Sequence, residues 1–157
     1  MLGKAYDTQV CSIARSLELV GERWSLLIIR DALFARVTRF GDFQHNLGIA
    51  TNVLAARLDA FVGSGIMRRE GRADYVLTAK GHALATALIA LTEWGDEWAA
   101  PGEPPILYHH EACDQPVGAR VVCDECGVID ARETTVKIGP GMPAEYVAAR
   151  RGGQRAS

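Results

Sequence analysis

The feature that most constrains the fold of this chain is the order of its periodic segments, which begins with two helices. Apolar residues recur at three- and four-residue steps between Thr8 and Val20, as in an amphipathic helix capped by Thr8 and ended by Gly21. The next segment, residues 23–34, is apolar on more than one side. We expect this second helix to form the buried centre of the core.

A short helix, a longer helix and a hairpin follow in that order. Thr38 is placed to cap the short helix and Gly48 to end it, and the longer helix is expected from Ala50 to Val62. The segments IMRRE and DYVLT favour β structure on either side of Gly71 and predict a hairpin. This is the element order of a winged helix-turn-helix, whose longer helix is held outward so that it can enter the DNA major groove.

A long fifth helix and a region of different character complete the chain. The helix is expected to open at Thr78 and to end in a proline-rich linker at 101–105. One apolar stripe runs along it: Leu84, Leu88, Leu91, Trp94 and Trp98. Beyond the linker, ILYHH, ARVVC and VIDARETTVKIG predict a small antiparallel sheet. We therefore expect an α+β, mainly α, chain: a winged helix-turn-helix domain over 1–100, a β-rich appendage over 101–147 and a disordered tail over 148–157.

Charge is informative only when it is divided along the chain. The net charge of the whole is -2, but residues 30–72 carry seven arginines and four acidic residues, a local excess of +3. Such an excess bears on nucleic-acid binding more than the total does. No apolar run is long enough to span a membrane and the start does not resemble a secretory signal, so we expect a cytoplasmic protein with no membrane partner.

Candidate DNA contacts cluster on the two helices and the hairpin. Asparagine can pair with adenine and arginine with guanine, while small residues such as Ala55 and Ala56 let a helix approach the bases. Arginines of the hairpin and of the start of the short helix suit phosphate or minor-groove contacts. The predicted DNA-binding residues are Arg36, Arg39, His45, Asn46, Thr51, Asn52, Arg57, Arg68, Arg69 and Arg72.

These residues stand in motifs that closely resemble the HxlR-type transcriptional regulators, relatives of the MarR winged-helix group, over about residues 10–98. The most specific motifs are GERW at 21–24, RFGDF at 39–43, LAARL at 54–58, YVLTAKG at 75–81 and WGDEW at 94–98. The resemblance implies a homodimer that pairs through its terminal helices and reads an inverted repeat in double-stranded DNA. The hairpin is the wing of such a fold. Its turn, REGRADY, is shorter than in many members of the family, which affects how far the wing could reach into the DNA minor groove.

Four cysteines suggest thiol or metal chemistry, because disulfides are rare in the cytosol. Cys11 is expected in the first turn of the first helix, where the helix dipole lowers a thiol pKa. The resemblance implies that a cysteine at this position senses oxidants or aldehydes in some members. The alternative is a packed, inert cysteine.

A second set of residues has metal-ligand spacing. His110 and Cys113 form one pair and Cys123 and Cys126 a second, and together they offer the four nitrogen and sulfur ligands that zinc accepts. A zinc ion would stabilise an appendage too small to fold by core burial alone. His109 is an alternative to His110, and core cysteines or a Cys123–Cys126 redox pair remain alternatives to zinc.

Three aromatic residues suggest a ligand pocket. Trp94, Trp98 and Tyr108 are expected to line an apolar site for a small-molecule effector between the fifth helix and the appendage. The principal reading is a dimeric regulator with no enzymatic activity. A small zinc- or thiol-dependent enzyme and a winged-helix protein-protein adaptor are the alternatives, and the enzyme lacks a recognisable set of nucleophile, base and orienting residue.

Overall fold

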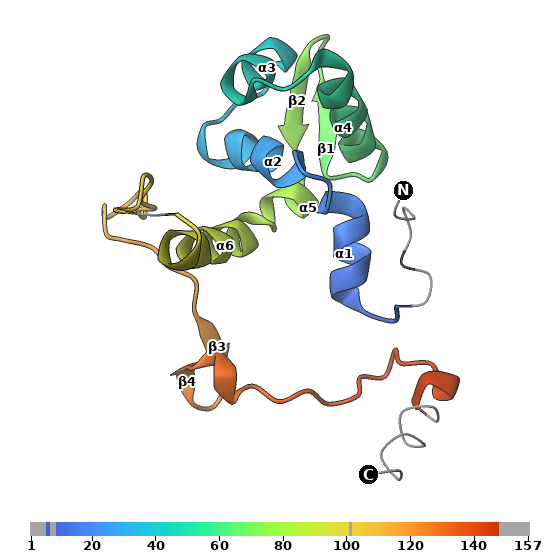
Figure 1. Ribbon diagram of the computed structural model, residues 1–157, viewed down its shortest axis with the longest axis vertical. Coiled ribbons are helices and arrows are strands. Elements are labelled where there is room, and N and C mark those ends of the chain that lie inside the picture. The colour runs from blue at the N-terminus through green and yellow to red at the C-terminus, as the bar shows by residue number, and fades with distance from the viewer. Residues whose placement is uncertain (1–5, 7–8, 101, 148–157) are drawn as a thin grey trace. The chain divides into compact units, whose positions relative to one another are not determined.

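The structure, a computed structural model, describes residues 6, 9–100 and 102–147, and the chain forms two compact units, Met1–Ala119 and Arg120–Ser157. The first unit contains α1 (Ser12–Val20), α2 (Ser25–Phe34), α3 (Phe40–Leu47), α4 (Thr51–Gly63), β1 (Met67–Glu70), β2 (Asp74–Leu77), α5 (Ala79–His82) and α6 (Ala85–Trp98) (Figure 1). The second contains β3 (Val121–Cys123), β4 (Gly127–Ile129) and the short 3-10 helix η1 (Ala131–Glu133). No helix in the described part of the chain is both long and apolar enough to cross a membrane.

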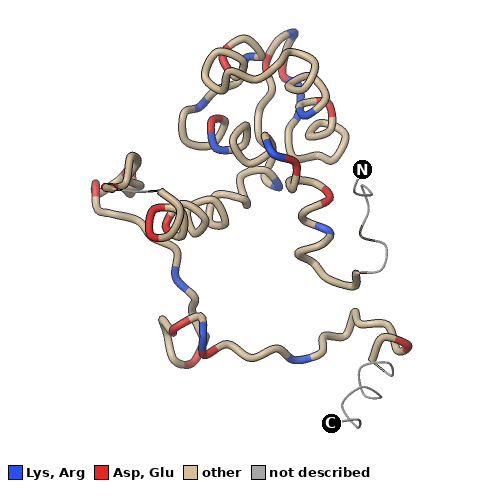
Figure 2. The backbone as a smooth tube through the Cα atoms, in the orientation of Figure 1, with Lys and Arg blue, Asp and Glu red and all other residues tan. Residues whose placement is uncertain are grey.

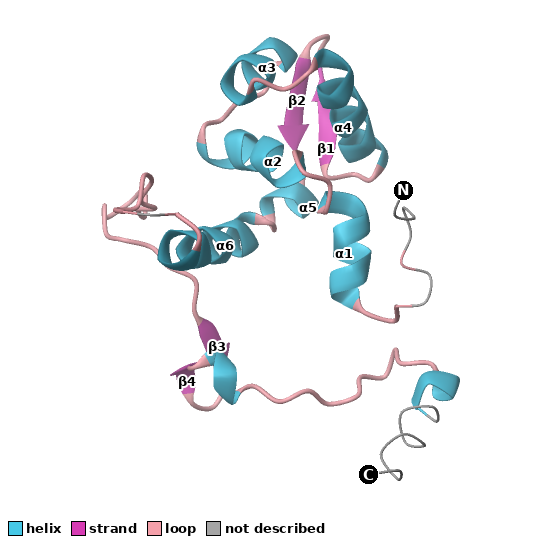
Figure 3. Cartoon of the chain, viewed as in Figure 1, coloured by secondary structure: helices cyan, strands magenta, loops and turns pink. Residues whose placement is uncertain are grey.

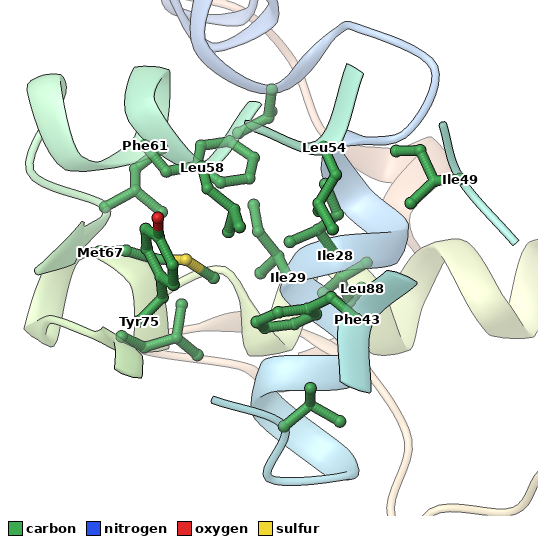
Figure 4. Close-up of a cluster of buried hydrophobic side chains, with 14 residues drawn as sticks. Ile28, Ile29, Phe43, Ile49, Leu54, Leu58, Phe61, Met67, Tyr75 and Leu88 are labelled. Carbon is green, nitrogen blue, oxygen red and sulfur yellow. The ribbon is translucent and has the colours of Figure 1, made fainter. Parts of the chain in front are cut away.

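The core of the first unit lies where α2, α3 and α4 meet the β1–β2 hairpin. Ile28 and Ile29 of α2 are fully buried, as are Phe43 of α3 and Leu54 and Leu58 of α4 (Figure 4). Burial of such side chains stabilises the fold by about 1.5–3 kcal/mol each. The prediction that the second helix forms the centre of the core is confirmed.

The hairpin is attached to the loop in front of α3 as well as to α4. Its strands pair from Met67↔Leu77 to Glu70↔Asp74. The backbone N–H of Tyr75 donates to the carbonyl of Thr38 at 2.8 Å, and the Thr38 hydroxyl donates to Asp74 Oδ1 at 2.7 Å. Thr38 is therefore not the cap of α3, as predicted from the sequence, because its side chain holds the hairpin instead.

The first helix begins later than predicted. Thr8 lies outside the described residues, and the N-cap of α1 is Cys11. Arg15 Nη2 donates to the carbonyls of Tyr6 and Gln9, and the N–H of Tyr6 donates to Glu18. Cys11 itself is extended, with φ -151° and ψ 130°, so the helix begins only after it.

The predicted long fifth helix is two helices, α5 and α6. Thr78 caps α5 by accepting the N–H of Gly81, and Ala83 and Leu84 separate the two helices. A side chain at Gly81 would collide with the carbonyl of Ile66, so this turn packs directly on the backbone just before β1. The apolar stripe divides accordingly: Leu88 is buried in the core, whereas Trp98 is 69% exposed.

The second unit forms less β structure than predicted. β3 and β4 pair antiparallel over three residues each, and the chain after η1 has no regular strand up to residue 139. ILYHH contributes only an isolated bridge, His109↔Pro116. Turn residues closely spaced along this region leave no segment long enough for a wider sheet. The predicted tail, 148–157, lies outside the described residues.

Along the chain, the boundary between the two units follows Ala119, whereas the sequence prediction placed it at the proline-rich linker. The segment beyond the linker remains with the first unit because it contacts α6. The Tyr108 hydroxyl lies 3.3 Å from Thr92 Oγ1, and the N–H of Ala119 donates to Glu93 at 3.2 Å.

Candidate nucleic-acid interface

The longer helix, α4, buries one face and exposes the other. Leu54, Leu58 and Phe61 are buried in the core, and Thr51 and Asn52 at its amino-terminal end are exposed. Figure 3 shows α4 along one side of the hairpin and α3, which precedes it in the chain, on the other side. The helix is therefore fixed from beneath while its first turn faces outward.

The end of α3 extends this exposed surface. His45 and Asn46 are exposed, and Gln44 Nε2 donates to the Thr51 hydroxyl at 2.7 Å across the turn between the helices. Gly48 ends α3 with φ +60°, a conformation that favours glycine. This turn sets the direction in which α4 leaves α3.

The side chain of Arg57 is more buried than those of the other residues predicted to contact bases. Its side chain is only 22% exposed, and its Nη1 lies 3.9 Å from Glu22 Oε1, just before α2. A cavity of about 230 Å³ beside it is also lined by Asn52 and Trp24. Arg57 therefore faces the side of α4 toward α2, whereas Asn52 is exposed.

The arginines of the hairpin are held by carboxylates. Arg69 donates to Asp59 of α4 at 2.9 Å and lies over the Tyr75 ring at 4.9 Å, and Arg68 pairs with Glu70 at 3.2 Å. Arg72 is exposed in the turn. Basic and acidic residues alternate over this part of the fold (Figure 2). Arg68 and Arg69 therefore each have a carboxylate partner in this structure.

The two remaining predicted DNA-binding arginines lie in the loop between α2 and α3. Arg36 is an exposed residue with φ +54°, a conformation that few side-chain-bearing residues adopt, and it lies 3.6 Å from Glu111. Arg39 is exposed and lies 3.8 Å from Asp74 of β2. Asp74 thus contacts both Thr38 and Arg39. The sequence contained no signal for this role of Asp74, because the pairing is between residues 36 positions apart.

The thiol of Cys11 is exposed at the amino end of α1. The backbone N–H groups of Ala14 and Ile13, at the start of α1, lower the pKa of the thiol. The predicted direction is the same, although the residue is the N-cap and not a first-turn residue. A thiolate at this position is a nucleophile that solvent can reach.

The predicted zinc ligands fall in different units. In the first, His110 Nδ1 lies 3.1 Å from Cys113 Sγ. In the second, backbone N–H groups of Cys126 and Glu125 lower the pKa of the Cys123 thiol. Over the described residues, no three or more His, Cys, Asp or Glu side chains are grouped to hold a metal ion. The zinc site stays a prediction.

The predicted ligand pocket is only partly assembled. Tyr108 lines two cavities, of about 580 and about 320 Å³, and Ile106 lies in the wall of both. Neither cavity is lined by Trp94 or Trp98, which are largely exposed on α6.

Comparisons with known proteins agree on the class of this chain. The family model of the HxlR-like helix-turn-helix matches residues 19–103. The HTH-type transcriptional regulator Rv3095 of Mycobacterium tuberculosis is 42% identical over 142 residues, which cover 85% of this chain and 89% of the relative. The regulator sll1512 of Synechocystis is 32% identical over 96 residues, which cover 57% of this chain and 70% of the relative.

Solved structures are similar as well. PA1607, described as a candidate transcription factor, has a TM-score of 0.73 and 38% identity, covering 84% of this chain and 97% of the neighbour. Quinone-bound YodB from B. subtilis has a TM-score of 0.51 and 28% identity, covering 57% of this chain and all of the neighbour. The named relatives are transcriptional regulators and not enzymes. With its helix-turn-helix and hairpin, the chain belongs to the HxlR-like helix-turn-helix family of transcriptional regulators.

Proposed function

We propose that the protein is a homodimeric regulator that reads an inverted repeat in double-stranded DNA with α4 and grips the flanking phosphates with the hairpin. The observation that carries this proposal is the two-faced character of α4. Its buried leucines fix the helix on the core, and its exposed first turn presents Thr51 and Asn52 beside His45 and Asn46 of α3. An asparagine side chain so placed can pair with an adenine edge.

Exposed apolar residues on the terminal helices support the dimer. Leu91, Trp94 and Trp98 of α6 are between 49% and 69% exposed, and Ile13 and Leu17 of α1 are also exposed. Large apolar side chains that cluster on a surface mark interaction sites. A twofold axis through these helices would present two copies of α4 about 34 Å apart, one turn of DNA.

Reaction of Cys11 is the proposed route of regulation. The sulfur is exposed, and the backbone N–H groups of Ala14 and Ile13 lower the pKa of the thiol, which favours the reactive thiolate. The similarity to quinone-bound YodB supports quinones as effectors that would react with Cys11. Zinc binding by His110, Cys113, Cys123 and Cys126 is a separate proposal, supported by the ligand types and spacing and by the 3.1 Å His110–Cys113 contact.

The test of the proposed function is DNA binding by the full chain. Fluorescence anisotropy with fragments that flank its own coding region should show saturable binding that weakens roughly 10³- to 10⁵-fold between 50 and 200 mM salt, as expected for six to ten phosphate contacts. Arg69→Ala should weaken binding to all sequences similarly. Arg132→Ala is the matched control, because Arg132 pairs with Asp130 in the second unit. If the chain shows no DNA binding that depends on salt and sequence, the result would support the alternative that it is a protein-protein adaptor.

A further inference from the structure

The segment just before α2 and the hairpin contact opposite sides of α4. On one side, Arg57 of α4 lies 3.9 Å from Glu22. On the other, Asp59 of α4 accepts a hydrogen bond from Arg69 of β1 at 2.9 Å. Because an α-helix turns about 100° per residue, side chains two positions apart leave it about 200° apart. A helix in the major groove has one phosphate backbone along each side. In such a complex the hairpin would face one backbone and the segment before α2 the other.

A cavity of about 230 Å³ lies between α4 and the segment just before α2. Its walls include Arg23 and Trp24 on one side and Asn52, Ala56 and Arg57 on the other. The cavity is several times larger than the roughly 30 Å³ that one water molecule takes up in the liquid, so it admits a phosphate group. Asn52 and Ala56 are exposed on α4, so the cavity borders the surface that we propose to read bases.

Arg23 is an exposed residue of this cavity and can bind an anion without first losing a partner. Arg57 in the same cavity, and Arg36 and Arg69 elsewhere in the first unit, each pair with a carboxylate. Arg23 forms no such pair with any residue that the structure describes. Glu22, its neighbour in the chain, lies against Arg57 instead. A phosphate bound at Arg23 would therefore displace no ion pair.

The ring of Trp24 restricts the guanidinium of Arg23. The Cζ atom of Arg23 lies 5.6 Å from the centroid of the Trp24 ring, within the range of a cation–π interaction. Trp24 is itself partly buried and packs against the core. A guanidinium held in this way loses less freedom when it binds, and its planar N–H groups match two oxygens of a phosphate.

We propose that Arg23 binds a phosphate of the DNA backbone on the side of α4 opposite the hairpin, and that Trp24 orients the guanidinium for this contact. Two N–H groups of Arg23 donate to phosphate oxygens, while the hairpin contacts the other backbone. The inference rests on the proposed function, because α4 must lie in the major groove for a phosphate to reach the cavity. The sequence did not predict this role of Arg23, because it depends on how the fold brings the segment before α2 against α4.

The salt dependence of DNA binding tests this contact. In fluorescence anisotropy with the full chain, Arg23→Ala should weaken DNA binding about tenfold, the effect of one hydrogen-bonded contact to a charged group. It should also reduce the slope of log affinity against log salt concentration by about 0.9, because one phosphate contact is lost. Arg23→Lys keeps the charge and should keep the slope. A wild-type slope in Arg23→Ala would overturn the proposal.

Lys137→Ala is the matched control for charge. It removes one positive charge at an exposed position of the second unit, and should leave both the affinity and the slope unchanged. If Lys137→Ala lowers the slope as much as Arg23→Ala does, the effect comes from total charge and the proposed contact is wrong.

Modified DNA separates a phosphate contact from a base contact. Phosphates carry no sequence information, so Arg23→Ala should weaken binding by the same factor on every single-base variant of the operator. Weakening confined to one base pair would mean that Arg23 reads a base, which contradicts the proposal.

Replacement of single operator phosphates by uncharged methylphosphonates locates the contact. One replacement should weaken binding of the wild type about tenfold and cause no further loss in Arg23→Ala, because the two changes remove the same interaction. If the wild type and Arg23→Ala respond alike to every replacement, Arg23 binds no phosphate.

Failure of this contact can be told from failure of the proposed function. A wild type whose DNA binding falls steeply with salt and is weakened by Arg69→Ala, but not by Arg23→Ala, would overturn the Arg23 contact alone. A wild type that binds no DNA would contradict the proposed function and the contact together.

Discussion

At the scale of single residues, the backbone N–H groups at the start of α1 favour the thiolate of Cys11. The N–H groups of Ala14 and Ile13 stabilise the charged sulfur more than the neutral thiol, so the pKa falls. The sequence was sufficient for the direction, because a cysteine near a helix start meets these donors in any register close to the correct one.

Labelling of Cys11 by iodoacetamide should therefore persist to lower pH than labelling of a free cysteine. A lowered pKa keeps the thiolate populated below the ordinary midpoint of about 8.5, and the rate falls only when the pH drops through the lowered value. Mass spectrometry of the Cys11 peptide measures that rate, and a chain with Cys113→Ser, Cys123→Ser and Cys126→Ser removes competing thiols. A midpoint at or above that of the model thiol would contradict the mechanism.

Arg57 makes a second test at this scale, because Glu22 lies 3.9 Å from it. If Arg57 leaves Glu22 to contact DNA, Arg57→Ala should relax base preference at one position by about 1–3 kcal/mol. Glu22→Gln should leave DNA affinity equal or raise it, since the arginine is then released. Anisotropy against a panel of single-base operator variants measures both. Loss of affinity in Glu22→Gln would show that the pair serves to position Arg57.

At the scale of elements, the order of helices and hairpin followed from the sequence, but several boundaries did not. Periodicity locates buried faces such as Leu54, Leu58 and Phe61, which is why α4 was predicted within a residue at each end. It cannot show that Thr38 bonds Asp74 instead of capping α3, or that Arg57 faces Glu22. Those choices depend on residues brought together by the fold.

The break between α5 and α6 gives a stability prediction. Gly81→Ala places a Cβ against the Ile66 carbonyl and 2.7 Å from Leu77 Cδ2, so the free energy of unfolding should fall by about 1–3 kcal/mol. Gly63→Ala, at the end of α4, meets no atom within 4 Å and should be neutral or stabilising by up to about 1 kcal/mol. Urea unfolding followed by circular dichroism compares the two. Equal stability of Gly81→Ala and the wild type would refute the close packing.

At the scale of the whole molecule, the exposed apolar residues of α6 lead us to predict a dimer. Trp94 and Trp98 are 57% and 69% exposed, an unusual state for tryptophans that line no described cavity. Sedimentation velocity at micromolar concentration should return a dimer. Trp98→Asp should shift it toward a monomer without loss of helix content, whereas Val136→Asp, at an exposed residue of the second unit, should not. A monomeric wild-type protein would contradict the proposal that a dimer reads an inverted repeat in DNA.

The zinc prediction, with His110, Cys113, Cys123 and Cys126 as ligands, also has a direct test. Native mass spectrometry should find one zinc ion per chain and none in Cys126→Ser. Asp124→Ser is the control, since it keeps both thiols. If protein purified without chelators carries no zinc, the zinc prediction is wrong and the four residues do not form a metal site.

The attachment of the hairpin to the loop before α3 limits how a signal can alter DNA binding. Thr38, Asp74 and Tyr75 join the hairpin to the loop before α3, and Arg69 joins it to α4 through Asp59. In a dimer, the hairpin, α3 and α4 of each protomer would then bind one half of the operator as a rigid body. An effector would change the distance or the angle between the two rigid bodies. Natural operators for such a protein should tolerate substitutions inside a half-site better than a one-base-pair change in the spacer.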